Sequence, residues 1–228
     1  MKPKIQFKVD KEYIKEDALY YLDKESFVKF VRDFKKLLDA RGMSKEEAKN
    51  LLNVEIDEIY SKENLDVLIP EIKKKWDTIK DTFFTEVEML FNHRWPKGTY
   101  EAYLSVFGMY RWKWGTKQFS IPTYDYAGNP PAFGHINFVI CHELLHIFIE
   151  DYYKKNFNGV LDKKKYNDFL ELMNCVVLNL PEINKITGWV NYPYEEHKTA
   201  YGTLKGVYSK SKDMKEFCEQ VVDYLEKN

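Results

Sequence analysis

Two histidines four residues apart are the side chains in this sequence best suited to chemistry. His142 and His146 enclose Glu143 in the pattern H-E-x-x-H, within a segment whose apolar spacing predicts a helix. An α-helix turns about 100° per residue, so positions four apart share a face and both imidazoles could bind one metal ion. Glu143 points to one side, where a carboxylate could hold a water molecule and take its proton. This arrangement suits the hydrolysis of an amide.

The residues around the pattern predict that this helix is largely buried. Two adjacent apolar stripes run along it, and the histidines belong to the second: Phe138, Cys141, Leu145 and Phe148, then Val139, His142 and His146. Imidazole groups are costly to bury unless they are paired or bound to a metal, and zinc is the simplest partner. The alternative is that the two histidines and the glutamate occupy the solvent-exposed face of an amphipathic helix.

A hydrolytic zinc site uses three protein ligands and keeps one position open, so a third ligand must come from elsewhere in the chain. Glu171 is the best candidate because it is a charge within the nearly apolar stretch 169–178, which Pro181 ends. The intervening chain is long enough for a loop near 156–159 and an antiparallel helix. Asn174, one turn further, could support a ligand by a hydrogen bond. The alternative is a solvated glutamate.

Two acidic residues nearer the pattern compete with that choice. Glu150 shares a face with His146, but three ligands in a row along one helix would spread over about 12 Å, too far for one ion. Glu150 is therefore expected to lie outside the ligand set. Asp151 is a candidate for orienting a ligand histidine.

Other residues could stabilise the oxyanion that forms during amide hydrolysis. His197 and Tyr194 are the candidates, with a surface-loop histidine as the alternative reading for His197. We expect a structural role for His135 at the start of the motif helix. We expect His93 to be a helix-end group that the helix dipole favours.

The pattern resembles that of the zincin metallopeptidases, and particularly the gluzincin group, in which a glutamate from a later helix joins the two motif histidines. The metzincin continuation is absent, because Ile149 and Tyr152 stand where that group has glycine and histidine. The resemblance covers roughly residues 99–200. It implies a zinc metallopeptidase that cleaves a peptide or protein substrate with Zn2+ as cofactor.

The same resemblance implies an α+β, zincin-like fold with a small mixed sheet, an active-site helix and a helical N-terminal part. We expect residues 1–95 to be mainly helical and to pack on a catalytic part at 96–228. In the zincins, the strand nearest the active-site helix pairs with extended substrate. Residues 117–122 or 102–107 would take that place here.

Local patterns predict the remaining elements. Ser44 and Glu47 form a capping box at a helix start, and Pro70 suits the first turn of another helix. The predicted helices cover 13–22, 27–38, 44–61 and about 69–95, and the predicted strands cover 5–9, 100–107, 110–114 and 119–122, with a loop at 125–131.

Composition limits the classes of protein. The 228 residues are 44% hydrophobic and 31% charged, which is typical of a soluble globular protein. A formal charge of −1 provides no net field for nucleic acid or for an anionic membrane. Cys141, Cys175 and Cys218 lack C-x-x-C spacing and fit a reducing cytosol. Without a signal peptide or a long apolar run, we expect a cytoplasmic protein.

Two alternatives to a peptidase remain open at this point. The first is a catalytically inactive zincin-like binding or scaffold protein with a structural metal site. Glu143 argues against it, because a structural site gains nothing from a general base. The second is a helical interaction protein that needs no metal. Substrate, cleavage specificity and oligomeric state are left open by the sequence.

Overall fold

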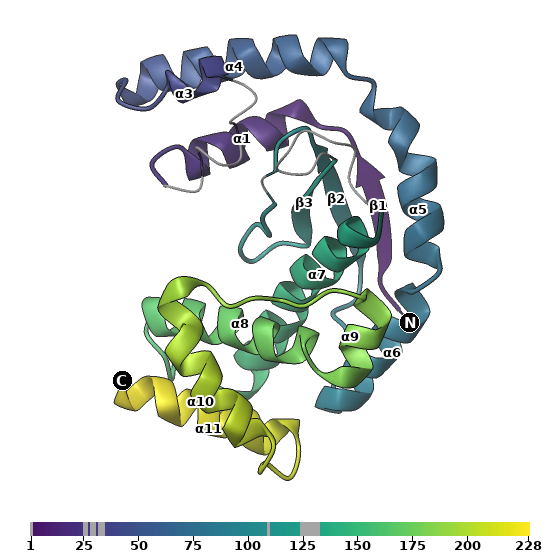
Figure 1. Cartoon of the computed structure of the whole chain (residues 1–228), viewed down its shortest axis with the longest axis vertical. Coiled ribbons are helices and arrows are strands. Elements are labelled where there is room, and N and C mark those ends of the chain that lie inside the picture. Colours follow the sequence, from purple (N-terminus) through teal and green to yellow (C-terminus); the bar gives the residue numbers. More distant parts are fainter. Residues whose placement is uncertain (1, 25–26, 28–30, 32–34, 109, 124–132) are drawn as a thin grey trace. The chain divides into compact units, whose positions relative to one another are not determined.

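The computed structural model describes residues 2–24, 27, 31, 35–108, 110–123 and 133–228. In this part of the chain the fold is α+β, with helices and one three-stranded parallel sheet (Figure 1). The α+β class predicted from the sequence is therefore confirmed. The sheet is parallel throughout the described strands, where a mixed sheet was expected.

The chain forms two compact units that interleave along the sequence. Unit 1 contains Met1–Pro3, Asp77–Gly98 and Cys141–Asn228, and unit 2 contains Lys4–Trp76 and Thr99–Ile140. Each unit draws on both the early and the late parts of the chain. The predicted organisation into 1–95 and 96–228 stays a prediction.

The sheet belongs to unit 2. Its strands are β1 (Lys4–Lys8), β2 (Thr99–Ser105) and β3 (Gln118–Pro122), in the order β1-β2-β3. These agree with three of the predicted strands. The strand predicted at 110–114 is wrong, because in that stretch Trp112 forms only an isolated antiparallel bridge to Phe119. The chain turns back immediately afterwards, at Gly115 with φ +70°, so no longer ladder forms.

The outer edge of β3 is partly occupied by the chain itself. The backbone N–H of Lys113 donates to Gln118 O (2.9 Å), and the N–H of Ser120 donates to Arg111 O (3.0 Å). Pro122 has no N–H to offer. β2 lies between the other two strands and has no free edge. Neither predicted substrate-pairing strand therefore presents an open ladder at these positions.

The helices of unit 2 are α1 (Lys11–Tyr21), α3 (Lys35–Leu38), α4 (Lys45–Lys62) and α5 (Ile69–Asp77), with a 3-10 turn at Leu65–Leu68. The capping box is confirmed, since Glu47 N donates to Ser44 Oγ (3.3 Å) and Ser44 N donates to Glu47 Oε2 (3.1 Å). Pro70 lies in the first turn of α5. Half of the helix predicted at 27–38 falls outside the described residues, and α3 covers its last four positions.

The single helix predicted over 69–95 is wrong. It is divided into α5 and α6 (Lys80–Phe91), and the break falls at Thr78 and Ile79. Both residues are β-branched, which lowers helix propensity because the preceding turn restricts their side chains. The spacing of apolar residues alone does not reveal such a break, because the apolar stripe continues through both helices.

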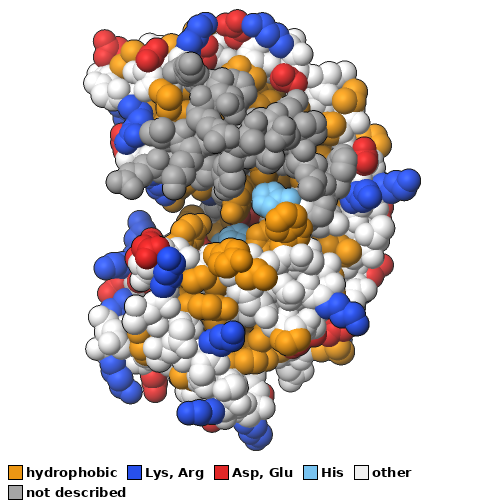
Figure 2. Space-filling view, viewed as in Figure 1, with side chains coloured by type: hydrophobic (Ala, Val, Ile, Leu, Met, Phe, Trp, Pro, Cys, Tyr) orange, Lys and Arg blue, Asp and Glu red, His pale blue; other side chains and the backbone are white. Residues whose placement is uncertain are grey.

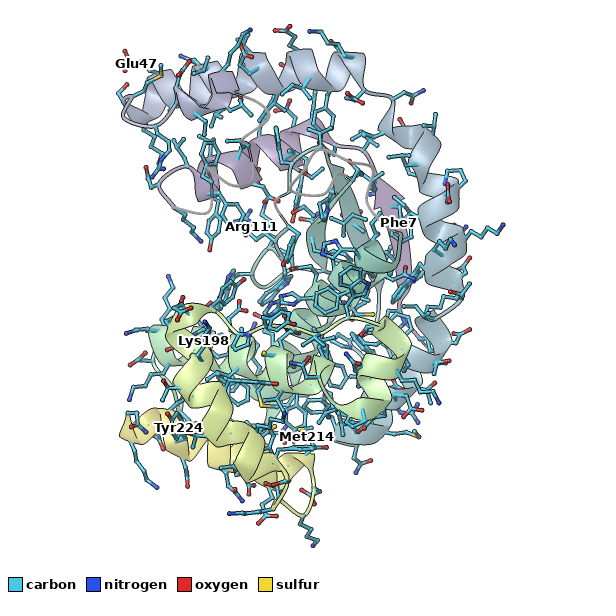
Figure 3. The ribbon with its side chains drawn as sticks, in the orientation of Figure 1. Phe7, Glu47, Arg111, Lys198, Met214 and Tyr224 are labelled. Atoms are coloured by element: carbon cyan, nitrogen blue, oxygen red, sulfur yellow. The ribbon has the colours of Figure 1, made fainter. Side chains whose placement is uncertain are left out.

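A buried ion pair ties α1 to the chain near β3 within unit 2. Asp17 is 1% exposed and accepts hydrogen bonds from Arg111 Nε (2.8 Å) and Ser120 Oγ (2.5 Å). Burial raises the pKa of the Asp17 carboxyl, while the guanidinium of Arg111, labelled in Figure 3, opposes that rise. Arg111 also lies over the ring of Tyr20, 4.2 Å from its centroid. These contacts join α1 to β3 and to the chain that precedes it.

Unit 1 is helical. It contains α6, most of α7 (Phe133–Asn156), α8 (Lys163–Leu178), α9 (Pro181–Thr187), a 3-10 turn at Glu195–His197, α10 (Lys198–Tyr208) and α11 (Met214–Lys227). Phe148 is fully buried on α7 and packs against Phe91 of α6 (5.2 Å between ring centroids) and Trp95 (4.7 Å). No helix in the described part of the chain combines the length and apolar character that a membrane crossing requires.

Candidate metal centre

The HExxH residues lie within α7, a helix of 24 residues. His142 is 5% exposed, Glu143 2% and His146 6%. The exposed-face alternative is therefore excluded for this segment. Every residue from 136 to 150 is buried, so this is a core helix rather than a surface helix.

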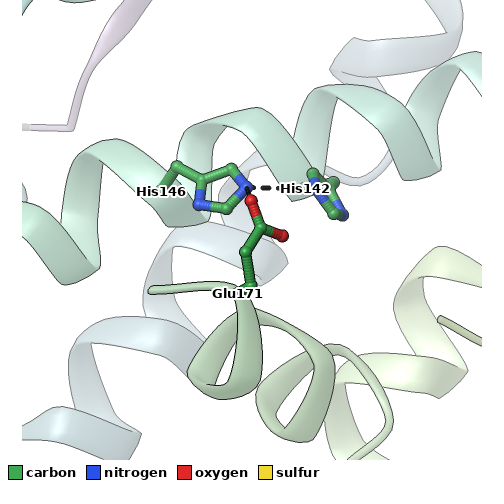
Figure 4. Close-up of side chains that lie close together, drawn as sticks. All are labelled: His142, His146 and Glu171. Carbon is green, nitrogen blue, oxygen red and sulfur yellow. Dashed lines mark hydrogen bonds and ion pairs between the residues drawn. The ribbon is translucent and has the colours of Figure 1, made fainter. Parts of the chain in front are cut away.

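Three potential ligand atoms converge in unit 1. His142 Nε2 lies 3.1 Å from His146 Nε2, and His146 Nε2 lies 3.7 Å from Glu171 Oε1 (Figure 4). All three ligand atoms lie within 4.8 Å of one another. Tetrahedral zinc with ligands at about 2.0–2.2 Å requires ligand atoms about 3.3 Å apart. The two imidazoles nearly have that spacing, and a small movement of the Glu171 side chain would complete it.

Glu171 reaches this position because α8 packs against α7. Asp162 caps the start of α8 by accepting a hydrogen bond from Lys165 N (2.9 Å). Further along α8, the side-chain amide of Asn174 donates to the backbone carbonyl of His142 (2.9 Å). The side chain of Glu171 is 21% exposed, so one side of the carboxylate faces solvent while the other faces His146.

Burial shifts the pKa of both motif histidines in the direction that metal ligation requires. Burial lowers the pKa of His142 to about 4. Burial, together with the neighbouring His142, also lowers the pKa of His146 well below its usual value. Both imidazoles are therefore neutral near pH 7, as metal ligation requires. The thiol of Cys175, one turn after Glu171, has its pKa raised to about 12 by burial and by the Glu171 charge, so it is not a thiolate ligand.

The two acidic rivals on α7 have other partners. Glu150 Oε1 accepts a hydrogen bond from Lys154 Nζ (2.8 Å). Asp151 Oδ2 lies 2.8 Å from His93 Nε2 and 2.7 Å from Lys155 Nζ. The prediction that Asp151 orients a ligand histidine is therefore wrong. Its carboxylate contacts His93, which follows the end of α6.

His93 follows α6 directly, as the sequence suggested. Its backbone N–H donates to Glu88 O (3.2 Å), after Asn92 has ended the helix in the left-handed conformation at φ 47°. Its ring also contacts Phe148, at 5.4 Å between centroids. These contacts, together with the Asp151 pair, anchor the end of α6 on α7.

His197 is buried, at 8% exposure, so the surface-loop alternative does not hold. His197 Nε2 lies 3.1 Å from Asp168 Oδ1 on α8, and its ring lies 6.0 Å from that of Tyr194, which is 53% exposed. Sequence reasoning missed Asp168. Its position three residues before Glu171 placed both carboxylates on one face of α8, and this spacing was a usable signal.

His135 lies in the first turn of α7 and is partly exposed, with its ring 6.2 Å from that of Phe138. This position agrees with the helix start predicted for it, and its role stays a prediction.

The geometry brings together His142, His146 and Glu171, with Glu143 beside them: its Oε1 lies 3.9 Å from His142 Nε2. Two neutral imidazoles and a carboxylate are the donor set of many hydrolytic zinc sites, and a second carboxylate next to them can act as a base.

No family model, curated protein or solved structure matches the chain. The resemblance to the zincins therefore rests on these side chains alone.

Proposed function

We propose that this protein is a zinc-dependent hydrolase, a metallopeptidase of zincin-like catalytic architecture. One observation carries the proposal: two buried, neutral imidazoles and a carboxylate from a second helix have their ligand atoms within 4.8 Å of one another. Burying two imidazoles beside this carboxylate without a cation would be costly. His142, His146 and Glu171 would hold the ion.

Zinc at this position supplies a Lewis acid that polarises a carbonyl and lowers the pKa of water. Glu143 is the general base, because it is buried beside His142 and follows it directly on the same helix. It holds the attacking water by one carboxylate oxygen and accepts its proton. It then delivers this proton to the leaving amine, so that the base regains its charge.

The developing oxyanion needs a donor besides the ion. His197 is the stronger of the two candidates, since Asp168 holds its ring in place on the Glu171 face of α8. Tyr194 packs edge-on against that ring and supports its orientation. In this proposal His197 donates to the oxyanion, and Asp168 orients the His197 ring.

The substrate class in this proposal is a peptide or an unfolded protein, and the location is the cytoplasm. The three cysteines are free and buried, which fits a reducing compartment.

Metal content and hydrolysis, measured on the same preparations, test the proposal. The wild-type protein should contain about one equivalent of zinc by elemental analysis. His146→Ala and Glu171→Ala should lower the zinc content, since each removes a ligand. Glu143→Gln should retain zinc and lose hydrolysis of a fluorescently labelled unfolded protein.

Met89→Ala is the matched control, because Met89 is 62% exposed in unit 1 and is not one of the proposed ligands. It should change neither zinc content nor hydrolysis. Unchanged zinc affinity in Glu171→Ala would refute the ligand assignment. A wild-type protein that binds zinc and hydrolyses no peptide would indicate the inactive scaffold alternative instead.

A further inference from the structure

The chain between α9 and α10 follows α8 along much of its length (Figure 1). At one end, Asn179, the C-cap residue of α8, forms two hydrogen bonds with the backbone of Asn191, from Nδ2 to Asn191 O (2.6 Å) and from Asn191 N to Oδ1 (2.9 Å). Cys175 Sγ also donates to Asn191 O (3.2 Å). At the other end, His197 pairs with Asp168. We call residues 189–197 the α8 strap.

The anchors of the strap lie on the face of α8 that carries Glu171. Asp168, Glu171, Cys175 and Asn179 are spaced by three, four and four residues, which places them on one side of a helix. The strap is fixed at Cys175 and Asn179 on one side of Glu171 and at Asp168 on the other. The backbone between these anchors therefore runs past the proposed metal ligand.

The strap carries an unusual run of exposed apolar side chains. Trp189 is 43% exposed, Val190 53%, Tyr192 82% and Tyr194 53%. Elsewhere in the described residues, large exposed hydrophobic side chains are scattered one at a time along the chain. Hydrophobic side chains also gather on the face of unit 1 seen in Figure 2. Exposed apolar groups concentrated beside a site mark a binding surface.

We propose that the α8 strap is the specificity surface of this enzyme and that it binds an aromatic or branched aliphatic side chain of an extended polypeptide next to the bond to be cleaved. This inference rests on the proposed function. Trp and Tyr rings provide large contact areas with little loss of side-chain entropy on binding. The double hydrogen bond from Asn179 holds the strap in place before the substrate arrives, which lowers the cost of binding.

The outer edge of β3, in unit 2, is a separate candidate for substrate binding by strand pairing. Its backbone groups at Gln118 and Ser120 are already bonded to residues 111–113, so strand pairing there is not offered to a substrate. Recognition in this proposal therefore depends on side chains of unit 1 alone. Asn179 is then a positioning residue, because it acts on the substrate only through the strap.

The test uses two fluorescent peptides that differ at one position, Phe in one and Ser in the other. They are presented to Glu143→Gln, which cannot turn them over, and binding is followed by fluorescence anisotropy. Glu143→Gln should bind the Phe peptide more tightly than the Ser peptide. Adding Trp189→Ala and Tyr192→Ala should reduce that preference by about three- to tenfold, the worth of one aromatic contact.

Asn179→Leu, in the same background, should reduce the preference while leaving zinc content unchanged. Adding Met89→Ala should leave it intact, because this exposed side chain lies on α6 and is not part of the strap. Unchanged discrimination after the Trp189→Ala and Tyr192→Ala changes would overturn the inference, even if zinc binding and hydrolysis are intact. A wild-type protein that contains no zinc and hydrolyses nothing, but keeps the peptide preference, would instead overturn the proposed function and leave the strap as a peptide-binding surface.

Binding to vesicles of phosphatidylcholine and phosphatidylserine is the remaining arm, because Trp and Tyr also favour membrane interfaces. The strap variants should bind these vesicles no differently from the wild-type protein. Vesicle binding that disappears with Trp189→Ala and Tyr192→Ala would assign the strap to a lipid surface and refute peptide recognition.

Discussion

Replacing His142 with glutamine in the metal-free protein should reduce the loss of stability that occurs as the pH falls. Burial lowers the pKa of His142 from 6.5 to about 4 in the folded state. Between these two values the unfolded chain binds a proton that the folded chain does not. The contribution of His142 to the free energy of unfolding is therefore complete above pH 6.5 and is lost as the pH falls toward 4.

The size of the effect follows from the two pKa values. One pKa unit corresponds to about 1.4 kcal/mol, so by pH 4.5 the folded protein should have lost about 2.5 kcal/mol through His142 alone. His146 should add a loss of the same sign, because burial lowers its pKa as well. Acidic side chains contribute in the same pH range, and comparison with the variant removes their part.

The assay is urea unfolding followed by tryptophan fluorescence, at pH 8 and pH 4.5, with a chelator present. The difference in unfolding free energy between the two pH values should be about 2.5 kcal/mol smaller in His142→Gln than in the wild-type protein. Tyr192→Ala, which removes an exposed side chain and no histidine, should show the full wild-type loss. An equal loss in His142→Gln and wild type would show that His142 is not held neutral by burial.

Two further predictions concern stability and positioning. Asn174→Ala removes the hydrogen bond to the His142 carbonyl, so it should lower the free energy of unfolding by about 1–2 kcal/mol and weaken zinc binding roughly tenfold, as measured by calorimetry. Lower stability with unchanged zinc affinity would show that Asn174 contributes to packing and not to zinc binding. Asp17→Ala should lower the free energy of unfolding in urea by about 3–5 kcal/mol, because Arg111 loses its carboxylate partner. Adding Arg111→Met should recover part of that loss. A loss below about 1 kcal/mol would show that the pair is not desolvated.

Patterns within a few residues of one another were the most informative part of the sequence. The spacing of His142 and His146 predicted a shared helix face, and α7 places their Nε2 atoms 3.1 Å apart. Ser44 and Glu47 predicted a helix start that the structure confirms. These patterns succeed because an α-helix relates neighbouring residues by a fixed rotation, whatever surrounds it.

The predictions that failed depended on what lies opposite a segment. Asp151 was a candidate for orienting a ligand histidine, yet it pairs with His93, which is distant in sequence. The stretch 110–114 has strand-forming residues but pairs through a single bridge at Trp112. Strand formation depends on which partner is available, and apolar spacing does not identify that partner.

The sequence by itself determined which side chains are available for chemistry and which of them share a helix. It pointed to Glu171 through the charge in an apolar helix, but the distance from Glu171 to His146 depends on how α8 packs on α7. Contacts such as that of Tyr153 with Phe169, at 5.1 Å between ring centroids, set this packing. The pairing of His197 with Asp168 and the path of the α8 strap were likewise decided by tertiary structure, because side-chain packing between distant segments has no fixed period in the sequence.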